Sequence, residues 1–480
     1  MKSLFTLCLL AISLSASAQT YVSVEAQDTT TIGLAALAFP GRSFPFTSAN
    51  YKITYNTVGV FGEPTTASGL LAIPTDRSLV YPMAVYNHGT VQNREAVPSR
   101  RGVQERLLPS GLAQSGYITV APDYLGLGDS ELAFHPYVHA ASEASAGRDL
   151  VLAAQQWLDE QGIAYNEQLF LTGYSQGGHA TQALHRDLEL NPGDDGLTVT
   201  AATHLSGPYS ISDVMRNTLF TELQTLPGYI AYTYISYDYV YDLFDDFEEI
   251  FQPAYLANIE AFANGLRDLG EFDAILTQQL ANNGDDLADI FQDSIRRQLA
   301  TKDLAAPVIQ AMLDNDTYDW APQSPTLIYY CTADEQVPFR NALLADSVMA
   351  ANGSTAVTVG NGGPRSHGAC VFPAITATLE FWDDLAERST VSTRDAIVDA
   401  PEVSIFPNPV RMGERLQLQG LKNQTGHAYQ LYDQLGRVTA YGVTTADGSL
   451  NVPTKLTPGI HLLRVELGNG TALVRRLVIR

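Results

Sequence analysis

One serine stands in a sequence context that could make it a nucleophile. Ser175 lies in residues 173–178, GYSQGG, directly after an apolar run and before a stretch with a helical pattern. Glycines on both sides allow a sharp strand-to-helix turn that projects the hydroxyl, because larger residues would collide there. At a helix start, the backbone N–H of Gln176 can also meet a developing oxyanion. The motif predicts Ser175 as a nucleophile; a tight turn with an incidental serine is the alternative.

A serine hydroxyl needs a base that removes its proton. His179 and His185 lie on the predicted helix that follows Ser175 and point away along it. His367 lies in residues 362–368, a Gly/Pro-rich segment after the last predicted strand. A loop histidine at that position can reach over the strand ends. We therefore predict His367 as the base, with a solvated loop residue as the alternative.

The base needs an acid that orients it, and the expected chain order is serine, acid, histidine. The acid should lie just past the strand that precedes His367. Asp334 stands there, in residues 331–338, CTADEQVP, and is the predicted acid. Glu335 is the alternative. Asp123 also follows a predicted strand, but it precedes Ser175 and is interpreted as a brace of its own turn.

The second oxyanion donor is expected in the loop after the strand that ends at Tyr86. His88, Gly89 and Thr90 form that loop, and we predict the Thr90 N–H as the donor beside Gln176. A plain turn glycine is the alternative interpretation of this loop. These groups suffice for acyl transfer, so the sequence implies neither a metal nor an organic cofactor.

Short apolar segments alternate with helical patterns along most of the chain. Strands are predicted at residues 51–55, 68–74, 83–86, 117–121, 169–172, 199–205, 326–330 and 355–359. Helices are predicted at residues 144–158, from the serine motif to about 188, at 341–349 and at 374–386. This alternation predicts a mostly parallel sheet covered on both faces, with its chemistry beyond the carboxyl ends of the strands.

Residues 210–320 are far longer than a strand-to-strand connection requires. Helical patterns occur at 252–269, 272–280, 287–299 and 304–313, which predicts a helical cap over the nucleophile. The six tyrosines between 229 and 241 either pack the cap or line a wall for an acyl group. The segment holds 20 acidic and 5 basic residues. This negative potential disfavours anionic substrates and favours neutral esters.

The chain ends differ in character from the acidic centre. The whole chain has 480 residues and a net charge of −24, which makes nucleic acid an unfavourable partner. Residues 1–18 have a basic start, an apolar run and small residues before the cleavage point, which predicts a secretory signal peptide. No other segment is long and apolar enough to span a membrane.

Residues 403–480 hold 9 basic and 4 acidic residues, which indicates a separate domain.

Two cysteines remain once the signal peptide, which contains Cys8, is removed. Cys331 lies three residues before Asp334, and Cys370 lies three residues after His367. In an exported protein this spacing suggests a disulfide between the acid segment and the base segment. Two buried thiols are the alternative.

With these residues in view, residues 45–390 resemble α/β-hydrolases of the secretory lipase type. The matching segments are 88–90 (HGT), 121–128 (APDYLGLG), 173–178 (GYSQGG), 207–209 (GPY), 318–322 (YDWAP) and 334–338 (DEQVP). The resemblance implies ester hydrolysis, with the triad roles on Ser175, Asp334 and His367. The serine motif is specific for the fold but not for the substrate, and the cap matches loosely.

The tail resembles the C-terminal sorting domain of type IX (Por) secretion in Bacteroidetes. The matching segments are 404–409 (SIFPNP), 431–437 (LYDQLGR), 458–465 (PGIHLLRV) and 475–480 (RRLVIR). Their alternating pattern with turn residues predicts a small β-sandwich. The resemblance implies that the type IX machinery is a partner and that the protein crosses the outer membrane, to be released or attached to the cell surface. A carbohydrate-binding or adhesion sandwich is the alternative.

The sequence thus predicts a signal peptide (1–18), an α/β-hydrolase domain (19–395) and a sorting domain (403–480). The expected activity is hydrolysis of small neutral carboxylic esters through an acyl-enzyme on Ser175. One alternative is a serine peptidase of the same fold, although such enzymes usually carry an N-terminal propeller and no repeats precede this domain. The other is a non-catalytic surface binding protein.

Overall fold

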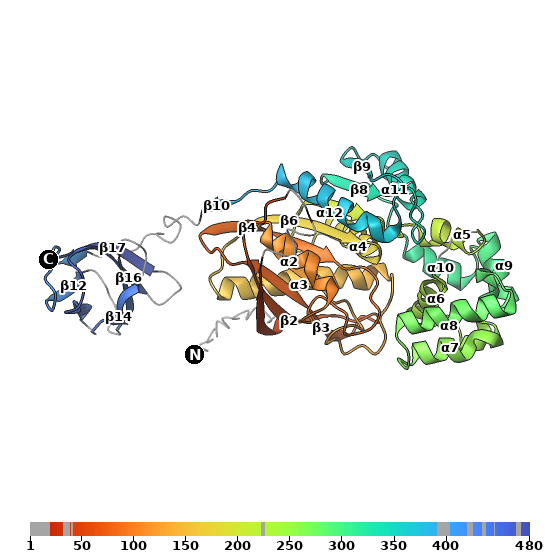
Figure 1. Cartoon of the computed structure of the whole chain (residues 1–480), viewed down its shortest axis with the longest axis horizontal. Helices are drawn as coiled ribbons and strands as arrows, with labels where there is room; N and C mark the ends of the chain where they lie inside the picture. The colour runs from red at the N-terminus through yellow and green to blue at the C-terminus, as the bar shows by residue number, and fades with distance from the viewer. Residues whose placement is uncertain are drawn as a thin grey trace, which may run out of the picture. The chain divides into compact units, whose positions relative to one another are not determined.

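The computed structural model describes residues 20–31, 39, 42–221, 226–390, 404–419, 426–433, 438–445, 447–466 and 472–480. The chain divides into two compact units, Met1–Ser389 and Thr390–Arg480 (Figure 1). The predicted signal peptide, residues 1–18, lies outside the described residues, as do residues 391–403 between the predicted domains.

A mixed β-sheet forms the centre of the first unit, in the order β1-β2-β3-β5-β4-β6-β7-β8-β9. Its strands are β1 Tyr21–Thr30, β2 Ser48–Val58, β3 Pro64–Pro74, β4 Leu79–Asn87, β5 Ile118–Pro122, β6 Tyr165–Tyr174, β7 Val199–Leu205, β8 Thr326–Tyr330 and β9 Val357–Asn361, with the short β10 Ser389–Thr390. The pairings from β5 to β9 are parallel. β1, β2, β3 and β5 pair antiparallel. The predicted strands are confirmed. The sheet is mixed because β1, β2 and β3 add antiparallel pairs to the parallel strands. β1 was not predicted because its sequence is polar.

Helices cover both faces of this sheet. α2 Leu107–Gln114 and α12 His367–Asp383 pack on one face, where Leu112 and Trp382 share a hydrophobic cluster with Ala84. α3 Ala140–Glu160 and α4 Gln176–Leu190 pack on the other, where Leu150 shares a cluster with Val85. Ala84 and Val85 face opposite layers because successive side chains of a strand alternate. α11 Arg340–Ala351 lies against β8 and β9.

The predicted cap is a set of helices inserted between β7 and β8. They are α5 Arg216–Thr218, α6 Pro227–Tyr241, α7 Pro253–Ala263, α8 Leu269–Asn283, α9 Asp293–Thr301 and α10 Pro307–Asp314, with a π-helical turn Ile211–Met215 and 3₁₀ turns Phe247–Glu249 and Leu287–Ile290. Figure 1 shows α6 to α9 gathered beyond one end of the sheet. The cap has its own hydrophobic core, in which Phe262 and Phe272 stack at 4.4 Å. The six tyrosines between residues 229 and 241 lie on α6.

The second unit contains two antiparallel sheets. One has the order β11-β12-β15 and the other β14-β13-β16-β17. Their bounds are β11 Ser404–Phe406, β12 Arg415–Gln419, β13 Ala428–Tyr432, β14 Val438–Val443, β15 Ser449–Asn451, β16 Gly459–Glu466 and β17 Ala472–Ile479. Leu416 of the first sheet and Leu431 and Leu463 of the second belong to one hydrophobic cluster. The β content agrees with the sequence, whereas the sorting role stays a prediction. In the parts of both units that the structure describes, no helix has the length and apolar character needed to cross a membrane.

Candidate active site

Ser175 stands on a strained turn between β6 and α4. Its backbone φ is +62°, a left-handed conformation that non-glycine residues rarely adopt. A side chain at Gly173 or Gly177 would collide with the backbone of Asn87, and one at Gly178 would meet the Leu205 carbonyl. The tight turn therefore requires the glycines of the motif, and it holds the serine at the carboxyl end of the central strand.

Three side chains form a hydrogen-bonded line at this end of the sheet. The Ser175 Oγ lies 2.9 Å from His367 Nε2, and His367 Nδ1 lies 2.8 Å from Asp334 Oδ2. Asp334 and His367 are buried, and Ser175 is partly exposed. The second Asp334 oxygen accepts the backbone N–H groups of Gln336 and Val337 at 3.0 and 2.8 Å. The structure thus brings together the three residues that the sequence selected, and it fixes the carboxylate from both sides.

His367 is held differently from the sequence expectation. It is the first residue of α12 and not a loop residue. The predicted helix start at 374 was wrong, because the helix begins seven residues earlier and contains Pro373 in its interior. The Tyr174 hydroxyl donates to the His367 carbonyl at 2.6 Å, and the His367 N–H donates to Glu335 Oε2 at 3.0 Å. Burial opposes ionisation of Glu335, but hydrogen bonds led by this one outweigh burial and lower the pKa of its carboxyl. Glu335, the alternative acid, thus binds the backbone and not the imidazole.

A disulfide joins the segments that carry the acid and the base. Cys331 and Cys370 are bonded across a sequence separation of 39 residues, and both are buried. Cys331 follows β8, and Cys370 lies one turn into α12, with its N–H donating to the Ser366 carbonyl at 3.0 Å. The bond therefore ties the Asp334 segment to the helix that begins at His367.

The two proposed oxyanion donors flank the nucleophile. Gln176 is the first residue of α4, and a side chain on Gly89, the neighbour of Thr90, would touch Ser175 Cβ at 3.7 Å. Among the hydrogen bonds of the described residues, none occupies the N–H of Gln176 or of Thr90. The Thr90 hydroxyl pairs with the Tyr137 hydroxyl at 2.8 Å. Both N–H groups are therefore free for an acceptor beside Ser175.

A buried polar network behind Gln176 was not foreseen from the sequence. The Gln176 amide nitrogen lies 3.0 Å from Glu143 Oε1 and 2.8 Å from His135 Nε2. Glu143 Oε2 lies 2.6 Å from His179 Nδ1, and both side chains are almost completely buried. Burial lowers the pKa of His135 to about 3, so this imidazole stays neutral and can accept the amide N–H. The network fixes Gln176, the residue with the first predicted oxyanion donor. Its members come from α3, α4 and the segment before α3, so no sequence pattern indicated it.

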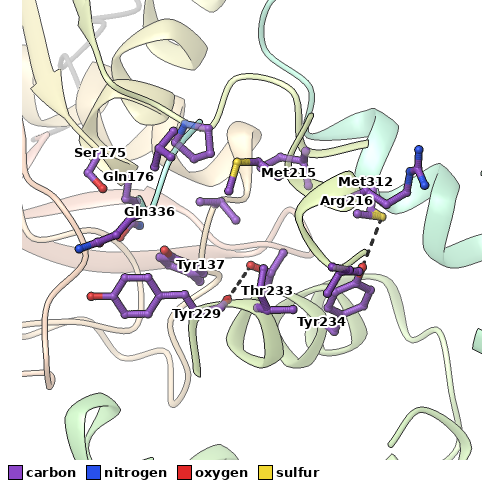
Figure 2. Close-up of a pocket in the computed structure, with 16 residues that line it drawn as sticks. Tyr137, Ser175, Gln176, Met215, Arg216, Tyr229, Thr233, Tyr234, Met312 and Gln336 are labelled. Atoms are coloured by element: carbon purple, nitrogen blue, oxygen red, sulfur yellow. Dashed lines mark hydrogen bonds between the residues drawn. The ribbon is translucent and has the colours of Figure 1, made fainter. Parts of the chain in front are cut away.

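A largely apolar pocket opens beside Ser175, and the empty space at the pocket, open solvent included, is about 620 Å³. Figure 2 shows Ser175 and Gln176 at one end and Met312 and Tyr234 at the other, with Met215 between them. Further lining residues come from the cap and the loops around the nucleophile: Tyr137, Val138, Pro208, Ile211, Leu219, Tyr229, Ile230, Thr233 and Val337. Arg216 also lines it, but its guanidinium donates to the Ser212 and Leu299 carbonyls. The pocket can therefore hold an apolar group of a substrate bound at Ser175.

The six tyrosines between residues 229 and 241 divide between the cap core and the pocket wall, and the binding of an acyl group to that wall stays a prediction. Tyr237 is fully buried in the cap core, whereas Tyr229 and Tyr234 line the pocket. Tyr232 stacks on Tyr137, with ring centroids 4.5 Å apart. Because Tyr137 also hydrogen-bonds to Thr90, this stacking connects the cap to the loop of residues 88–90. Across the described parts of the chain, no cluster of three or more His, Cys, Asp or Glu side chains is arranged to hold a metal ion.

Comparisons with known proteins agree with this geometry. The model of the prolyl oligopeptidase family matches residues 106–188, which include Ser175. No curated protein matches the chain by sequence.

Many solved structures resemble this chain, among them the following three. The rice cell wall degrading esterase LipA from Xanthomonas oryzae is 26% identical, with 77% of this chain and 98% of that chain covered at a TM-score of 0.67. A candidate hydrolase from Legionella pneumophila is 27% identical, with 76% and 98% covered at a TM-score of 0.70. Candida antarctica lipase A, at 16% identity, 75% and 82% coverage and a TM-score of 0.53, supports the fold alone. The chain therefore has the α/β-hydrolase fold, with the side-chain arrangement of a serine hydrolase.

Proposed function

We propose that the protein is a secreted serine esterase of the lipase type that hydrolyses neutral carboxylic esters. The observation that carries the proposal is the hydrogen-bonded line from Ser175 Oγ through His367 to Asp334, beside an apolar pocket. The esterase LipA, which matches over 98% of its length, supports an ester as the substrate.

In the first half of the reaction, Ser175 Oγ attacks the ester carbonyl while its proton passes to His367 Nε2. Asp334 stabilises the imidazolium through Nδ1–H. The carbonyl oxygen becomes an oxyanion, which the N–H groups of Gln176 and Thr90 stabilise. When the tetrahedral intermediate collapses, the bond to the alcohol oxygen breaks and His367 returns the proton to it. The alcohol leaves, and the acyl group stays on Ser175.

In the second half, water takes the place of the alcohol. His367 accepts a proton from the water as its oxygen attacks the acyl carbonyl, and the same donors hold the oxyanion. Collapse breaks the bond to Ser175 Oγ, which regains its proton, and the carboxylic acid leaves. No metal or organic cofactor is required for these steps.

The acyl group is proposed to occupy the pocket between Ser175 and Met312. Its wall consists mostly of aliphatic, methionine and tyrosine side chains, with Gln176, Thr233 and Gln336 as polar members. Among the described lining residues the charged one is Arg216, whose guanidinium donates to backbone carbonyls and lies 3.5 Å from the Asp213 carboxylate. Such a wall suits an uncharged acyl or aromatic acid. On the cap surface, Asp242, Asp245 and Asp246 are exposed, which disfavours anionic substrates.

Export is the second part of the proposal. The sequence of residues 1–18 supports a cleaved signal peptide, and the motifs of residues 403–480 support recognition by type IX secretion machinery. The disulfide between Cys331 and Cys370 agrees with an oxidising compartment. A reporter that carries residues 1–18 at its start and residues 403–480 at its end, expressed in a type IX-competent bacterium, should be exported; retention in the periplasm would contradict this part.

A serine peptidase is the second candidate, because the prolyl oligopeptidase family model matches residues 106–188. One panel separates the candidates: p-nitrophenyl esters of increasing acyl length and aminoacyl anilides, each with the wild type and Ser175→Ala. An esterase hydrolyses the esters, and Ser175→Ala abolishes the activity. Hydrolysis of anilides without esters would favour the peptidase, and no hydrolysis of either would favour a binding protein.

A further inference from the structure

A second pocket lies against the proposed active site and shares no lining residue with the acyl pocket. The empty space at this pocket, open solvent included, is about 690 Å³. Its described lining residues are Tyr86, Gly89, Gln104, Glu105, Leu107, Leu108, Tyr174, Gly368, Val371 and Phe372. Three of these residues adjoin the reacting groups in sequence: Gly89 precedes Thr90, Tyr174 precedes Ser175 and Gly368 follows His367. The three segments that carry Thr90, Ser175 and His367 therefore meet at this pocket.

The position of the pocket matches the path of the leaving alcohol. His367 protonates the alcohol oxygen in the proposed mechanism, so the alcohol leaves on the side of this imidazole. Gly368, Val371 and Phe372 belong to the first two turns of α12, the helix that His367 begins. The acyl pocket, by contrast, extends from Ser175 under the cap. The two pockets thus divide a substrate into acyl and alcohol portions.

Among the described residues that line this second pocket, Glu105 is the one with a formal charge, and it is partly buried. Among the described residues, no hydrogen-bond donor or basic side chain is paired with its carboxylate. Burial raises the pKa of Glu105 to about 7. A carboxylate without a partner is unfavourable in such surroundings, so a bound cation would stabilise it.

Aromatic and aliphatic side chains make up most of the described lining of the pocket that contains Glu105. Tyr86 and Tyr174 are buried in the wall, and Phe372 is 41% exposed at the edge. The Tyr174 hydroxyl is already used by the His367 carbonyl. Ring faces with one carboxylate are the groups that bind an ammonium ion. A sugar needs several donors and acceptors, whereas the polar groups of the described lining residues, besides Glu105, are the Gln104 amide and the Tyr86 and Tyr174 hydroxyls.

We propose that this second pocket is the alcohol subsite and that it binds a positively charged group of the alcohol, with Glu105 as its counter-ion. The inference rests on the proposed function and extends it from neutral esters to esters of an ammonium-bearing alcohol. The exposed acids of the cap add a negative potential that attracts such substrates.

The test compares two acetyl esters of nearly equal shape, acetylcholine and 3,3-dimethylbutyl acetate. Both form the same acetyl-enzyme, so a difference in kcat/KM reports binding of the alcohol portion during acylation. The wild type should favour acetylcholine at least 10-fold. Glu105→Gln should reduce the ratio to about 1, and Glu105→Lys should reverse it. Glu131→Gln removes the charge of an exposed glutamate outside the pocket and should keep the wild-type ratio.

Other arms of the experiment separate the ways in which the inference can fail. If p-nitrophenyl acetate is not hydrolysed by the wild type, the proposed function itself fails. If it is hydrolysed but the wild type does not favour acetylcholine, or Glu105→Gln keeps the preference, the cation subsite is wrong. A Glu105-dependent preference for an acetylated methyl glucoside over both esters would replace the cation by a sugar. Should Glu105→Gln not fold, choline must inhibit wild-type hydrolysis of p-nitrophenyl acetate more strongly than 3,3-dimethylbutanol does; equal inhibition overturns the inference.

Discussion

Glu335 Oε2 accepts the backbone N–H of His367 at 3.0 Å, while the neighbouring carboxylate of Asp334 binds the imidazole of the same histidine. Two adjacent acids thus hold one residue by different atoms. The arrangement separates the candidates that the sequence left open, because of the two acids it is Asp334 that hydrogen-bonds to the imidazole ring.

Asp334→Asn should lower kcat for a p-nitrophenyl ester by about 10³- to 10⁴-fold, since an amide can turn its N–H₂ towards Nδ1 and favour the wrong tautomer. Glu335→Gln keeps an oxygen acceptor for the His367 N–H and should lower kcat less than about 10-fold. Steady-state kinetics of the two variants measure the contrast. Equal losses would mean that the acids share the orienting role.

Removing the disulfide should affect both stability and activity. The bond closes a loop of 39 residues, so Cys331→Ser with Cys370→Ser should lower the free energy of unfolding by about 3 to 4 kcal/mol. Urea unfolding of the oxidised wild type and the double variant measures this loss. Because the bond joins the Asp334 segment to α12, kcat should fall as well. Unchanged unfolding after reduction of the wild type would contradict the prediction.

Tyr137→Phe should lower kcat by about 3- to 10-fold with little change in stability. The substitution removes the partner of the Thr90 hydroxyl, 2.8 Å away, and loosens the loop that carries the second oxyanion donor. Tyr239→Phe is a change of the same kind outside the pocket and serves as the control. A rise in KM with constant kcat would show that Tyr137 only binds substrate.

Filling the acyl pocket should shorten the accepted acyl chain in a graded way. Met215 lies between Ser175 and Met312 in the pocket (Figure 2). Met312→Trp should lower kcat/KM about 10- to 100-fold for decanoate but not butyrate, whereas Met215→Trp should reduce both. Hydrolysis of acetate by each variant reports an intact triad. The same chain-length profile in both variants would place the acyl group elsewhere.

Glu105→Gln should stabilise the protein above neutral pH. The pKa of Glu105 is raised by burial from an ordinary 4.5 to about 7, so between these values the folded state keeps a proton that the unfolded state has lost. Wild-type stability therefore falls, relative to the variant, as pH rises from 4.5 to 7. The variant should gain about 1 to 3 kcal/mol at pH 8 and little at pH 4. Thermal unfolding at both pH values checks this, with Glu131→Gln as the control; a gain that is equal at both would contradict it.

Much of this architecture could be predicted because its signals are local. Gly173, Gly177 and Gly178 are required by backbone crowding around Ser175, so the motif carries its own geometry. Asp334 and His367 follow from the strand-end rule and from chain order. Each of these inferences needs only the segment around the residue and the general plan of the sheet.

The parts that escaped prediction depend on long-range packing. β1 is polar and forms because β2 offers an edge, and α6 contains tyrosines at positions that only the folded cap divides between core and pocket. The Glu143–His179 pair joins α3 to α4, 36 residues apart. Glu105 becomes a candidate binding residue only in the folded chain, where Gly89, Tyr174 and Gly368 line the same pocket. No pattern within a segment indicates such neighbours.

Covalent trapping tests the central claim most directly. The purified protein is treated with a p-nitrophenyl alkylphosphonate, and the modified peptide is identified by mass spectrometry. We predict one phosphonyl group per chain, on Ser175, with loss of ester hydrolysis in proportion to labelling and no labelling of Ser175→Ala. Labelling of another residue that abolishes activity, or ester hydrolysis by Ser175→Ala at the wild-type rate, would contradict the assignment of Ser175 as the nucleophile.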